Sequence, residues 1–545
     1  MRRFLLLALF LAACAAPAPR PAALPPEPPS PATRLRDAIL KDSHAHEYTR
    51  ELADRIGPRL AGSPGDARAV AWAKGAMETI GLTDVRTEPV KVPRWVRGVE
   101  TAQIVTPSPQ PLVVTAVGGS VSTPADGIEA EIVEAATFDD FAKLPDSAIK
   151  GKIAFFYAVM EKGPTGKGYG ATHRYRTEAA SIAAKRGAAA VLARSLSTDD
   201  ARLPHTGAMR YADDAPKIPA AMLAPPDADL LHRLGGRIRV RLTLTCQTLP
   251  DATSANVIGE IRGREKPEEI VLLGAHLDSW DLGAGAQDDG AGVGIVLETA
   301  RQILAANAPP RRTIRFVLFA NEENGLRGGI AYAQAHQAEL AKHVLALEAD
   351  GGDGQPTGFS YMGGPEQAAA AAPIAALLAP LGVGAPEVAD HHGADLTPLR
   401  PAGVPMVHVL QDVTHYFDWH HSADDTYDKI RPDQLARAAA AFATVTYAAA
   451  DSPSSFGRVP EPPPSATKPW ALPSSSPASS CRSTSASARS SAPPTPPGTA
   501  PPVPPGSPSA GAPAASRRHP RTAAPPGSNR ARSPGTPPSS TTGGA

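Results

Sequence analysis

Short apolar runs bounded by glycine or proline recur along the second half of the chain and predict buried strands: Asn256–Ile261, Val271–Leu273, Ile314–Phe319, Val344–Leu347 and Pro405–Leu410. Such runs, apolar on both faces and rich in β-branched residues, are typical of parallel strands. Between and after them, apolar residues recur at helical spacing, from Val293 to Leu304 and from Pro432 to Asp451. The pattern predicts an α/β fold with a mixed, mostly parallel sheet sandwiched by helices.

The first half of the chain predicts two amino-terminal helices and a separate insert. Apolar spacing places the helices at 42–56 and 67–80, and Gly81 suits the C-cap of the second. Residues 103–250 predict a smaller α/β or β-rich unit, with strands at 151–156, 187–192 and 217–223 and a helix at 178–186.

One stretch within this insert differs from its surroundings. Residues 161–176 are charged and rich in glycine, which predicts a loop. This loop either reaches the ligand-binding edge of the main sheet or is simply solvated.

The first 14 residues have the pattern of an export signal. Arg2-Arg3 is a positive head, Phe4–Leu11 is apolar but too short to span a bilayer, and Leu-Ala-Ala-Cys ends at Cys14. This ending resembles a bacterial lipobox, in which the cysteine becomes the lipidated first residue. We therefore expect an exported lipoprotein that contacts the membrane through Cys14, in the outer membrane and facing the periplasm or the exterior. The alternative is an ordinary secretory signal cut nearby.

Composition divides the rest of the chain. Residues 15–34 predict a proline-rich tether, and residues 453–545, rich in Pro, Ser, Ala and Arg, predict a disordered tail. The main domain is then formed by 35–102 together with 251–452, around the insert 103–250.

Length, charge and cysteine content narrow the class of protein. A chain of 545 residues that is 42% hydrophobic can form two or three domains with real cores. Its formal net charge is zero, which gives no reason to expect a nucleic-acid partner. Of its three cysteines, Cys14 is assigned to the lipid and Cys481 lies in the tail, so no structural disulfide is expected.

Acidic residues and histidines follow the predicted strands of the main domain, in the motifs VLLGAHLDSW, GAQDDGAG, FANEENG, LALEADGG and WHHSADDT. The residues of interest are His276, Asp288, Glu323, Asp350 and His421, with Glu322 beside one of them. Open α/β sheets bind ligands at the carboxyl ends of their strands, so we expect these side chains to lie together. Two imidazoles and three carboxylates suit two zinc ions bridged by a carboxylate and a water, an arrangement that supports hydrolysis.

Each motif alone has an ordinary structural explanation. His276 could be a hydrogen-bonded core histidine, Asp288-Asp289-Gly290 a turn or helix start, and Glu322-Glu323 a solvated loop. Asp350 could belong to a strand-end turn, and His420-His421 to the surface. Two observations favour the metal site: all the motifs follow strands, and the H-x-D spacing lets Asp278 take the second ring proton of His276.

The order of the motifs resembles that of the di-zinc exopeptidases of clan MH. H-x-D, D-D-G, E-E-x-G-L, an aspartate after a strand and H-S-x-x-D-T follow one another, and HLDSWDLG, QDDGAG and NEENGLRGG are highly specific matches. The chain is most similar to the bacterial aminopeptidase and carboxypeptidase Q (plasma glutamate carboxypeptidase) branch, over roughly residues 35 to 452. The resemblance implies the phosphorylase/hydrolase-like zinc peptidase fold. It also implies that the insert resembles a protease-associated domain, which walls the cleft and limits access to small peptides.

The resemblance also implies a ligand set. One zinc ion would be held by His276, Asp288 and Asp350, and the second by Asp288, Glu323 and His421, so that Asp288 bridges them. His421 is chosen over its neighbour because it lies four residues before the Asp-Thr pair of the last motif.

The remaining roles also follow from the resemblance. Glu322 is the general base, and Asp278 orients the ring of His276. The peptide bond between Asp288 and Asp289 is expected to be cis.

The implied reaction is hydrolysis of dipeptides or of the amino-terminal bond of short peptides, with a metal-bridging water as nucleophile. Glu322 would take the proton of this water and pass it to the leaving amine. The same fold supports amidohydrolases and glutaminyl cyclases. A third reading is a catalytically silent, lipid-anchored binding protein, but inactive relatives lose ligands and none is missing here. The expected partner is a small peptide, and a homodimer is left open.

Four further residues are candidates to line the substrate pocket, with simple packing as the alternative: Asp395, Tyr416, Trp419 and His420. Of these, His420 and Tyr416 are the candidates to stabilise the oxyanion.

Overall fold

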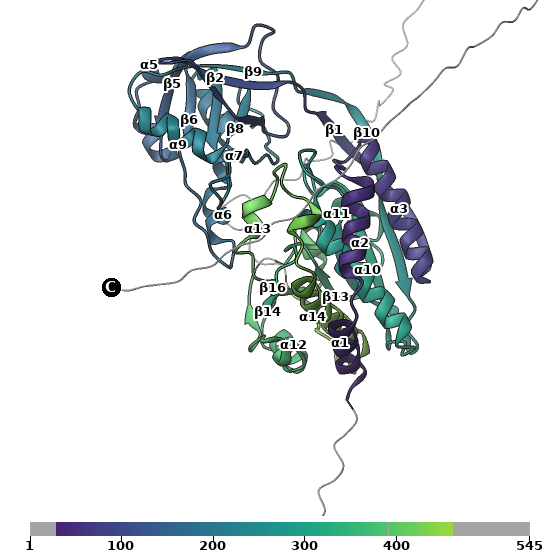
Figure 1. The fold of residues 1–545 in the computed structure, drawn as a ribbon. Helices are drawn as coiled ribbons and strands as arrows, with labels where there is room; N and C mark the ends of the chain where they lie inside the picture. The colour runs from purple at the N-terminus through teal and green to yellow at the C-terminus, as the bar shows by residue number, and fades with distance from the viewer. Residues whose placement is uncertain (1–28, 391, 461–545) are drawn as a thin grey trace, which may run out of the picture. The chain divides into compact units, whose positions relative to one another are not determined.

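The computed structural model describes residues 29–390 and 392–460, whose larger part is built on a five-stranded sheet (Figure 1). Its strands, in spatial order, are β1 (Thr83–Val96), β10 (Gln247–Ile261), β12 (Arg312–Phe319), β11 (Lys266–His276) and β13 (His343–Glu348). β11 is parallel to β12 and β13, whereas β10 is antiparallel to both β1 and β12.

A three-stranded sheet continues this one. Its order is β15 (Glu387–Val388), β14 (Pro356–Tyr361) and β16 (Val407–Gln411), and a parallel bridge from Ala346 to Met406 places β16 beside β13. β14 is antiparallel to β16. The mixed α/β class is therefore confirmed, with more antiparallel pairing than the apolar runs alone suggest.

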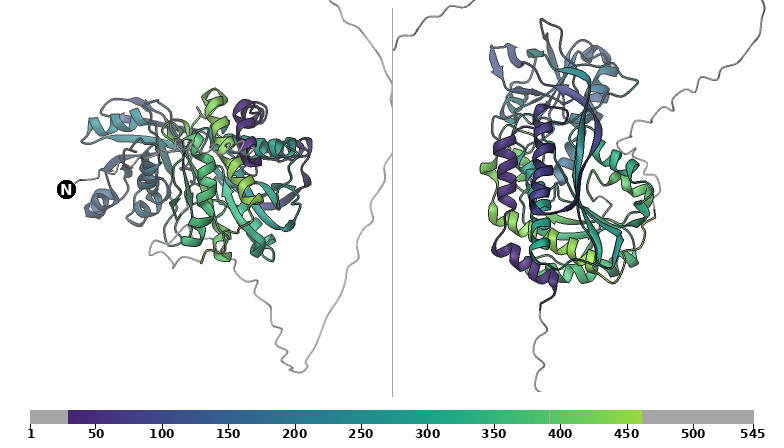
Figure 2. Two further views of the ribbon diagram at one scale, coloured as in Figure 1. Left: turned by 90° about the horizontal axis from the view of Figure 1, so that it is seen from below. Right: turned by 90° about the vertical axis from the view of Figure 1, so that its right-hand side faces the viewer.

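Both faces of the main sheet are covered. On one face, Val271 and Leu273 pack in a core with α1 (Pro31–Lys41), α2 (Ala45–Arg50), α3 (Pro64–Ile80), α10 (Ala291–Ala305), α12 (Pro365–Leu378) and α14 (Pro432–Asp451). The two views of Figure 2 show helices lying along the sheet. On the other face, Leu272 and Val317 pack with α11 (Arg327–Ala335) and the short helices η3 (Leu340–Lys342) and η5 (Thr397–Ala402). This alternation explains why the strands are apolar on both faces.

The predicted amino-terminal helices are present with small changes. Helix α3 ends at Gly81, whose φ of 96° is the left-handed conformation of a helix C-cap. The predicted helix 42–56 begins three residues later, and residues 45–56 form α2 and then a π-helical turn, η1 (Glu51–Ile56).

Helix α1 corrects the boundary of the predicted tether 15–34. It begins at Pro31, where the side chain of Ser30 accepts a hydrogen bond from the Thr33 N–H, and it buries Ala32 and Leu35. Proline in this stretch starts a helix instead of extending a linker.

The predicted tail also begins later than residue 453. Phe456 and Val459 are buried, and the guanidinium of Arg458 donates to the main-chain oxygens of Leu340 and His343. Residues 453–460 therefore belong to the folded unit. Their two apolar side chains are too few to stand out against the Pro/Ser composition that follows.

The insert forms an eight-stranded sheet of its own. In spatial order it contains β3 (Gln110–Leu112), β2 (Glu100–Thr106), β9 (Arg239–Leu244), β5 (Ile128–Ala135), β6 (Ile153–Phe156), β7 (Ala190–Arg194), β8 (Ala220–Leu223) and β4 (Val114–Ala116). The three strands predicted in the insert correspond to β6, β7 and β8, which pair in parallel. Helices α4 (Phe138–Lys143), α5 (Asp146–Ile149), α8 (Ala179–Lys185) and α9 (Pro225–Leu234) accompany this sheet, and the long strands β1 and β10 run between it and the main sheet.

The stretch 161–176 is not a loop throughout. It contains α6 (Lys167–Thr172) and leads into α7 (Arg174–Thr177). Both helices are short, which is why glycine and charge hide them in the sequence.

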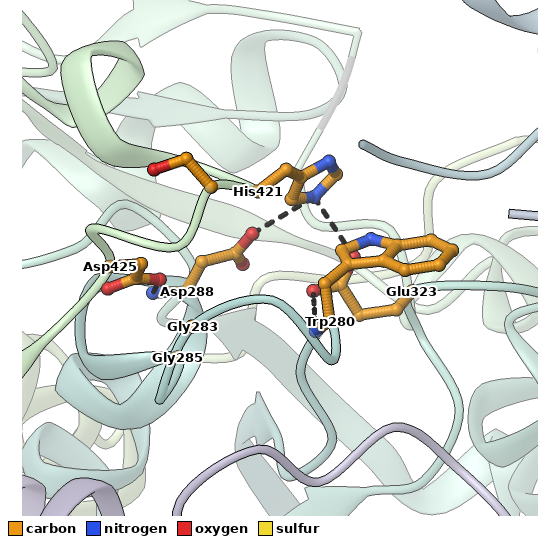
Figure 3. A pocket seen from close by; sticks show the side chains of 8 residues that line it. Trp280, Gly283, Gly285, Asp288, Glu323, His421 and Asp425 are labelled. Atoms are coloured by element: carbon orange, nitrogen blue, oxygen red, sulfur yellow. Dashed lines mark hydrogen bonds and ion pairs between the residues drawn. The ribbon is translucent and has the colours of Figure 1, made fainter. Parts of the chain in front are cut away.

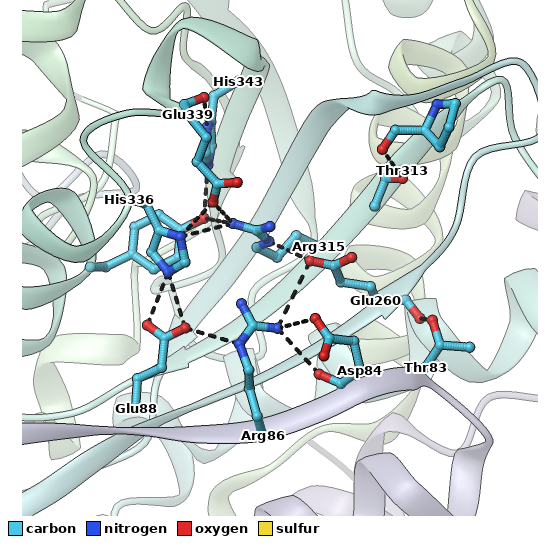
Figure 4. A network of polar contacts seen from close by, with 12 residues as sticks. Thr83, Asp84, Arg86, Glu88, Glu260, Thr313, Arg315, His336, Glu339 and His343 are labelled. Atoms are coloured by element: carbon cyan, nitrogen blue, oxygen red, sulfur yellow. Dashed lines mark hydrogen bonds and ion pairs between the residues drawn. The ribbon is translucent and has the colours of Figure 1, made fainter.

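A polar network joins three strands of the main sheet to the segment after α11 (Figure 4). Arg315 on β12 donates to Glu260 on β10 at 2.7 Å and also contacts Glu339. His336, next to Glu339, lies 3.0 Å from Glu88 on β1. The network fastens β1 to the sheet through side chains, in addition to its main-chain pairing with β10.

No helix within residues 29–390 and 392–460 is long and apolar enough to cross a membrane. The predicted export signal with Cys14, most of the tether, and the tail from residue 461 with Cys481 lie outside the described residues. Cys246 is a buried free thiol.

Candidate metal centre

The main sheet brings the predicted ligands together at the carboxyl ends of its strands. β11 ends at His276, and Glu323 and Asp350 follow β12 and β13. Asp288 lies in a turn, η2 (Ala286–Gly290), before α10, and its own backbone angles are not helical. His421 follows α13 (Tyr416–Trp419). Residues up to 145 positions apart in the chain thus converge, as expected for an α/β sheet.

Asp288 lies between the two histidines. Its Oδ1 is 3.1 Å from His276 Nε2, and its Oδ2 is 3.1 Å from His421 Nε2. The first histidine also lies 3.5 Å from Asp350 Oδ1, and the second lies 3.0 Å from Glu323 Oε2. The side chains therefore form two clusters that share one carboxylate.

A small cavity opens on the second cluster (Figure 3). Asp288, Glu323 and His421 line it together with Trp280 and Asp425. The main-chain N–H of Trp280 donates to Glu323 Oε1 at 3.2 Å, which fixes that carboxylate in the wall of the cavity.

Two neighbouring residues also have ligand atoms close to these clusters. His420 Nε2 is 3.5 Å from Asp288 Oδ2, and Asp289 groups with His276 and Asp350. Asp289, however, already accepts the N–H groups of His276 and Gly292, so its carboxylate caps the start of α10.

Burial and mutual charge shift the pKa values of the clustered groups. Burial favours the neutral form of Asp288, but hydrogen bonds with His276 and His421 outweigh it and hold the pKa of this carboxyl well below its ordinary value. Burial disfavours the charged form of His421, yet Glu323 and Asp288 raise its pKa to about 9. Burial raises the pKa of Glu323, and the charge of Asp288 raises it further. The site therefore favours positive charge between its carboxylates.

The structure corrects the predicted role of Asp278. The Nδ1 of His276 lies 3.0 Å from the main-chain oxygen of Asp278 but 3.9 Å from its carboxylate, which is beyond hydrogen-bond distance. The carboxylate instead accepts the N–H of Glu322 at 3.0 Å. The main chain therefore orients the ring, and the Asp278 side chain positions Glu322. Burial raises the pKa of Asp278 to about 7.

Two buried residues that hold the site together were not predicted. Asp425 accepts the N–H groups of Gln287 and Asp288, and so fixes the turn that carries Asp288. Arg59, 0% exposed, donates to the main-chain oxygens of Leu277, Ala284 and Gly285. Asp425 belongs to the last family motif, which was a usable signal, whereas Arg59 lies between the predicted helices 42–56 and 67–80, where no site residue is expected.

The insert reaches His421. Its Nδ1 lies 3.2 Å from the main-chain oxygen of Thr206 and 3.4 Å from Arg176 Nη1, and the Thr206 N–H donates to the His421 main-chain oxygen at 2.9 Å. Arg176 is the last residue of the stretch 161–176. Of the two alternatives predicted for this stretch, the one in which it reaches the ligand-binding edge of the main sheet is therefore correct.

The four pocket candidates have different surroundings. Trp419 is half-buried and stacks on His415, with ring centroids 6.2 Å apart. His420 stacks on His421 with ring centroids 3.5 Å apart, and Tyr416 packs against His420. Asp395 is fully buried and accepts the Gly329 N–H, so it supports α11 from within and lines no open surface. The peptide bond between Asp288 and Asp289 is cis, as expected.

Comparison with known proteins identifies relatives over most of the chain. The model of peptidase family M28 matches residues 256–446. Carboxypeptidase Q of Homo sapiens is 36% identical over 413 residues, which are 75% of this chain and 86% of the relative.

Solved structures agree. The peptidase M28 precursor of Shewanella amazonensis is 42% identical, with a TM-score of 0.77 over 79% of this chain and 98% of that one. A zinc aminopeptidase of Bacillus subtilis shares the fold at 22% identity, with a TM-score of 0.58 over 77% of this chain and 97% of that one. These relatives confirm the predicted class of enzyme: the chain belongs to peptidase family M28.

Proposed function

We propose that the protein is a co-catalytic di-zinc exopeptidase that hydrolyses dipeptides or the amino-terminal bond of short peptides. The observation that carries this proposal is the position of Asp288, whose two oxygens each lie 3.1 Å from a different histidine. The names of the relatives, carboxypeptidase Q and zinc aminopeptidase, support both the metal and the exopeptidase class.

The donor set fits two zinc ions. His276, Asp288 and Asp350 would hold one ion, and Asp288, Glu323 and His421 the other, which gives imidazole nitrogen and carboxylate oxygen to each. When bound, zinc lowers the pKa of a water molecule and polarises a carbonyl group. The raised pKa of His421 and the crowding of carboxylates support the same conclusion, since both favour a cation in this place.

Glu322 is the proposed general base. It adjoins Glu323, and its main chain is held by the Asp278 carboxylate. Burial raises its pKa well above the ordinary value of a glutamate, and the charges of Asp350 and Glu323 raise it further. A carboxyl group of this kind can take the proton of the attacking water and deliver it to the leaving amine.

The proposal also covers the insert and the amino-terminal Cys14. The insert is proposed to be a protease-associated domain that limits the site to small peptides, and Cys14 is proposed to anchor the exported protein to a membrane through a lipid. The contacts of Thr206 and Arg176 with His421 support a role for the insert at the site.

The test is hydrolysis of dipeptides, amino-acid anilides and amino-terminal glutamine peptides by the purified protein, with and without chelator. We expect dipeptide hydrolysis that chelator abolishes and zinc restores. Glu322→Gln should lower kcat by about 100- to 10,000-fold with two zinc ions retained. Glu78→Gln, in an exposed pair with Lys74, is the matched control and should be fully active.

Three results would contradict the proposal. Zinc loss in Glu322→Gln would make Glu322 a ligand and reverse the roles of the glutamate pair. Cyclisation of amino-terminal glutamine without peptide hydrolysis would identify a cyclase. A freshly purified protein that holds no zinc and hydrolyses no peptide would be a binding protein.

A further inference from the structure

Arg176 is a buried cation beside the candidate metal centre. It lies at the end of the 161–176 stretch and is 7% exposed. Its Nη2 donates to the Tyr169 hydroxyl at 2.7 Å, and its Nη1 lies 3.3 Å from the Thr206 oxygen and 3.4 Å from His421 Nδ1. Gly207 makes room for it, since a Cβ at that position would lie 2.3 Å from Arg176 Nη1. The guanidinium is therefore held in a built position.

This cation lacks a counter-ion. Among residues 29–390 and 392–460, no carboxylate lies within ion-pair distance of Arg176, and its Nε has no hydrogen-bond partner. Buried charges in proteins are normally paired, because an unpaired charge pays a large desolvation cost. A guanidinium with a free N–H and a fork of donors suits a carboxylate better than any other common group.

Tyr169 completes the donor set. Its hydroxyl oxygen accepts from Arg176, so its own proton remains free to be donated. Burial raises the pKa of Tyr169, which keeps that proton in place at neutral pH. Its ring stacks on Phe417 and meets His420 edge-on, which places it against the segment that carries His421.

The spacing limits the length of a bound peptide. One nitrogen of the His421 ring faces Asp288 and Glu323, and the other faces Arg176. A carboxylate bound by Arg176 is therefore about one imidazole ring away from the predicted metal ligands. One residue of extended chain spans about 3.5 Å, so the carboxylate of a dipeptide can reach this position while its peptide bond lies at the metal centre. Each added residue would carry the carboxylate past it.

We propose that Arg176 and Tyr169 bind the free α-carboxylate of the substrate and so make the enzyme selective for dipeptides. This inference rests on the proposed function. The metal ligands alone do not decide between a dipeptidase and a general aminopeptidase, and this inference assigns that choice to residues of the insert.

The test compares alanyl-alanine with alanyl-alanine amide in the wild-type protein and in Arg176→Met. A charge-assisted pair should favour the free dipeptide by about 10- to 100-fold in kcat/KM in the wild type. Arg176→Met should lose that preference, mainly through KM, because kcat/KM for the free dipeptide should fall by a larger factor than kcat/KM for the amide, with the zinc content retained. Tyr169→Phe, which removes only a hydroxyl, should reduce the preference in the same direction by a smaller factor.

Arg174→Met is the matched control, because Arg174 lies on the same helix but is exposed and paired with Glu178. It should keep the wild-type preference. Equal wild-type rates on the two substrates would overturn the assignment, as would an equal loss on both in Arg176→Met, which would indicate support of His421. A wild-type preference for alanyl-aspartate amide, whose only carboxylate is in the side chain, over alanyl-alanine amide would also overturn it. Hydrolysis of neither substrate by the wild type would overturn the proposed function and this assignment with it.

Discussion

Arg59 offers the most direct test of how the candidate site is built. It is completely buried, and it donates to three main-chain oxygens: Leu277 at 2.6 Å, Ala284 at 2.6 Å and Gly285 at 2.9 Å. These oxygens span the loop that leaves His276 and leads to the turn of Asp288. Arg59→Met keeps much of the side-chain volume but removes every one of these bonds.

The expected cost can be worked out from these contacts. A buried carbonyl left without a donor costs about 1–3 kcal/mol, and three such carbonyls are affected. Against this stands the desolvation of the guanidinium, since burial lowers the pKa of Arg59 and an apolar replacement avoids that burial. The carbonyls are main-chain groups that cannot be replaced, so we expect a net loss of about 3–5 kcal/mol in the free energy of unfolding.

Urea unfolding followed by tryptophan fluorescence measures this loss, because Trp280 lies within the loop. Arg59→Lys should fall between Met and the wild type, since an ammonium cannot match the planar fork of the guanidinium. Arg55→Met, at an exposed position nearby, is the control. If Arg59→Met unfolds within about 0.5 kcal/mol of this control, the loop is held by something else and the reasoning fails.

Three other predictions concern separate parts of the molecule. Asp278→Ala should lower kcat by about 10- to 100-fold with zinc affinity nearly unchanged, because the Asp278 carboxylate holds Glu322 and not the ring of His276. A loss of zinc affinity as large as the loss of kcat, measured by competition with a chelator, would contradict this. His336 helps to hold the pKa of Glu88 below its ordinary 4.5 despite burial. The wild type should therefore be more stable than Glu88→Gln above about pH 5, and it should lose this advantage as the pH falls through the pKa of Glu88 in the folded state. A difference in Tm between the two proteins that is constant from pH 3 to 8 would refute this. A chain that ends at residue 460 should be as stable as the full chain in urea unfolding, whereas one that ends at 452 loses buried apolar side chains and should be about 2–4 kcal/mol less stable. Equal stability of the two truncated chains would show that residues 453–460 contribute nothing.

The sequence predicts those parts of the site that are encoded locally. His276, Glu323 and Asp350 each follow a short apolar run that favours a buried strand, and the topology of an α/β sheet then brings them to one edge. The turn of Asp288 and the segment of His421 are recognised through the family motifs, which record a tertiary arrangement in short stretches of sequence.

The supporting contacts escape prediction because they join distant residues. Arg59 reaches loops more than 200 positions away, and Thr206 meets His421 across 215 positions. No periodicity or composition records such pairs. The error over Asp278 has the same origin: an H-x-D spacing permits a bond from the carboxylate to the ring, but the main-chain oxygen occupies that position and the carboxylate turns to Glu322.

These long-range contacts couple the insert to the candidate site. Strands β1 and β10 alone connect its sheet to the main sheet by the chain, and two strands would leave the insert free to tilt. Two ion pairs oppose this motion: Arg97 with Asp281, at 2.7 Å, and Lys162 with Asp418, at 2.7 Å. Asp281 adjoins Trp280, whose N–H fixes Glu323, and Asp418 lies in the helix just before His421. Because both pairs end on segments that carry predicted ligands, we expect a motion of the insert to shift the candidate metal centre as well.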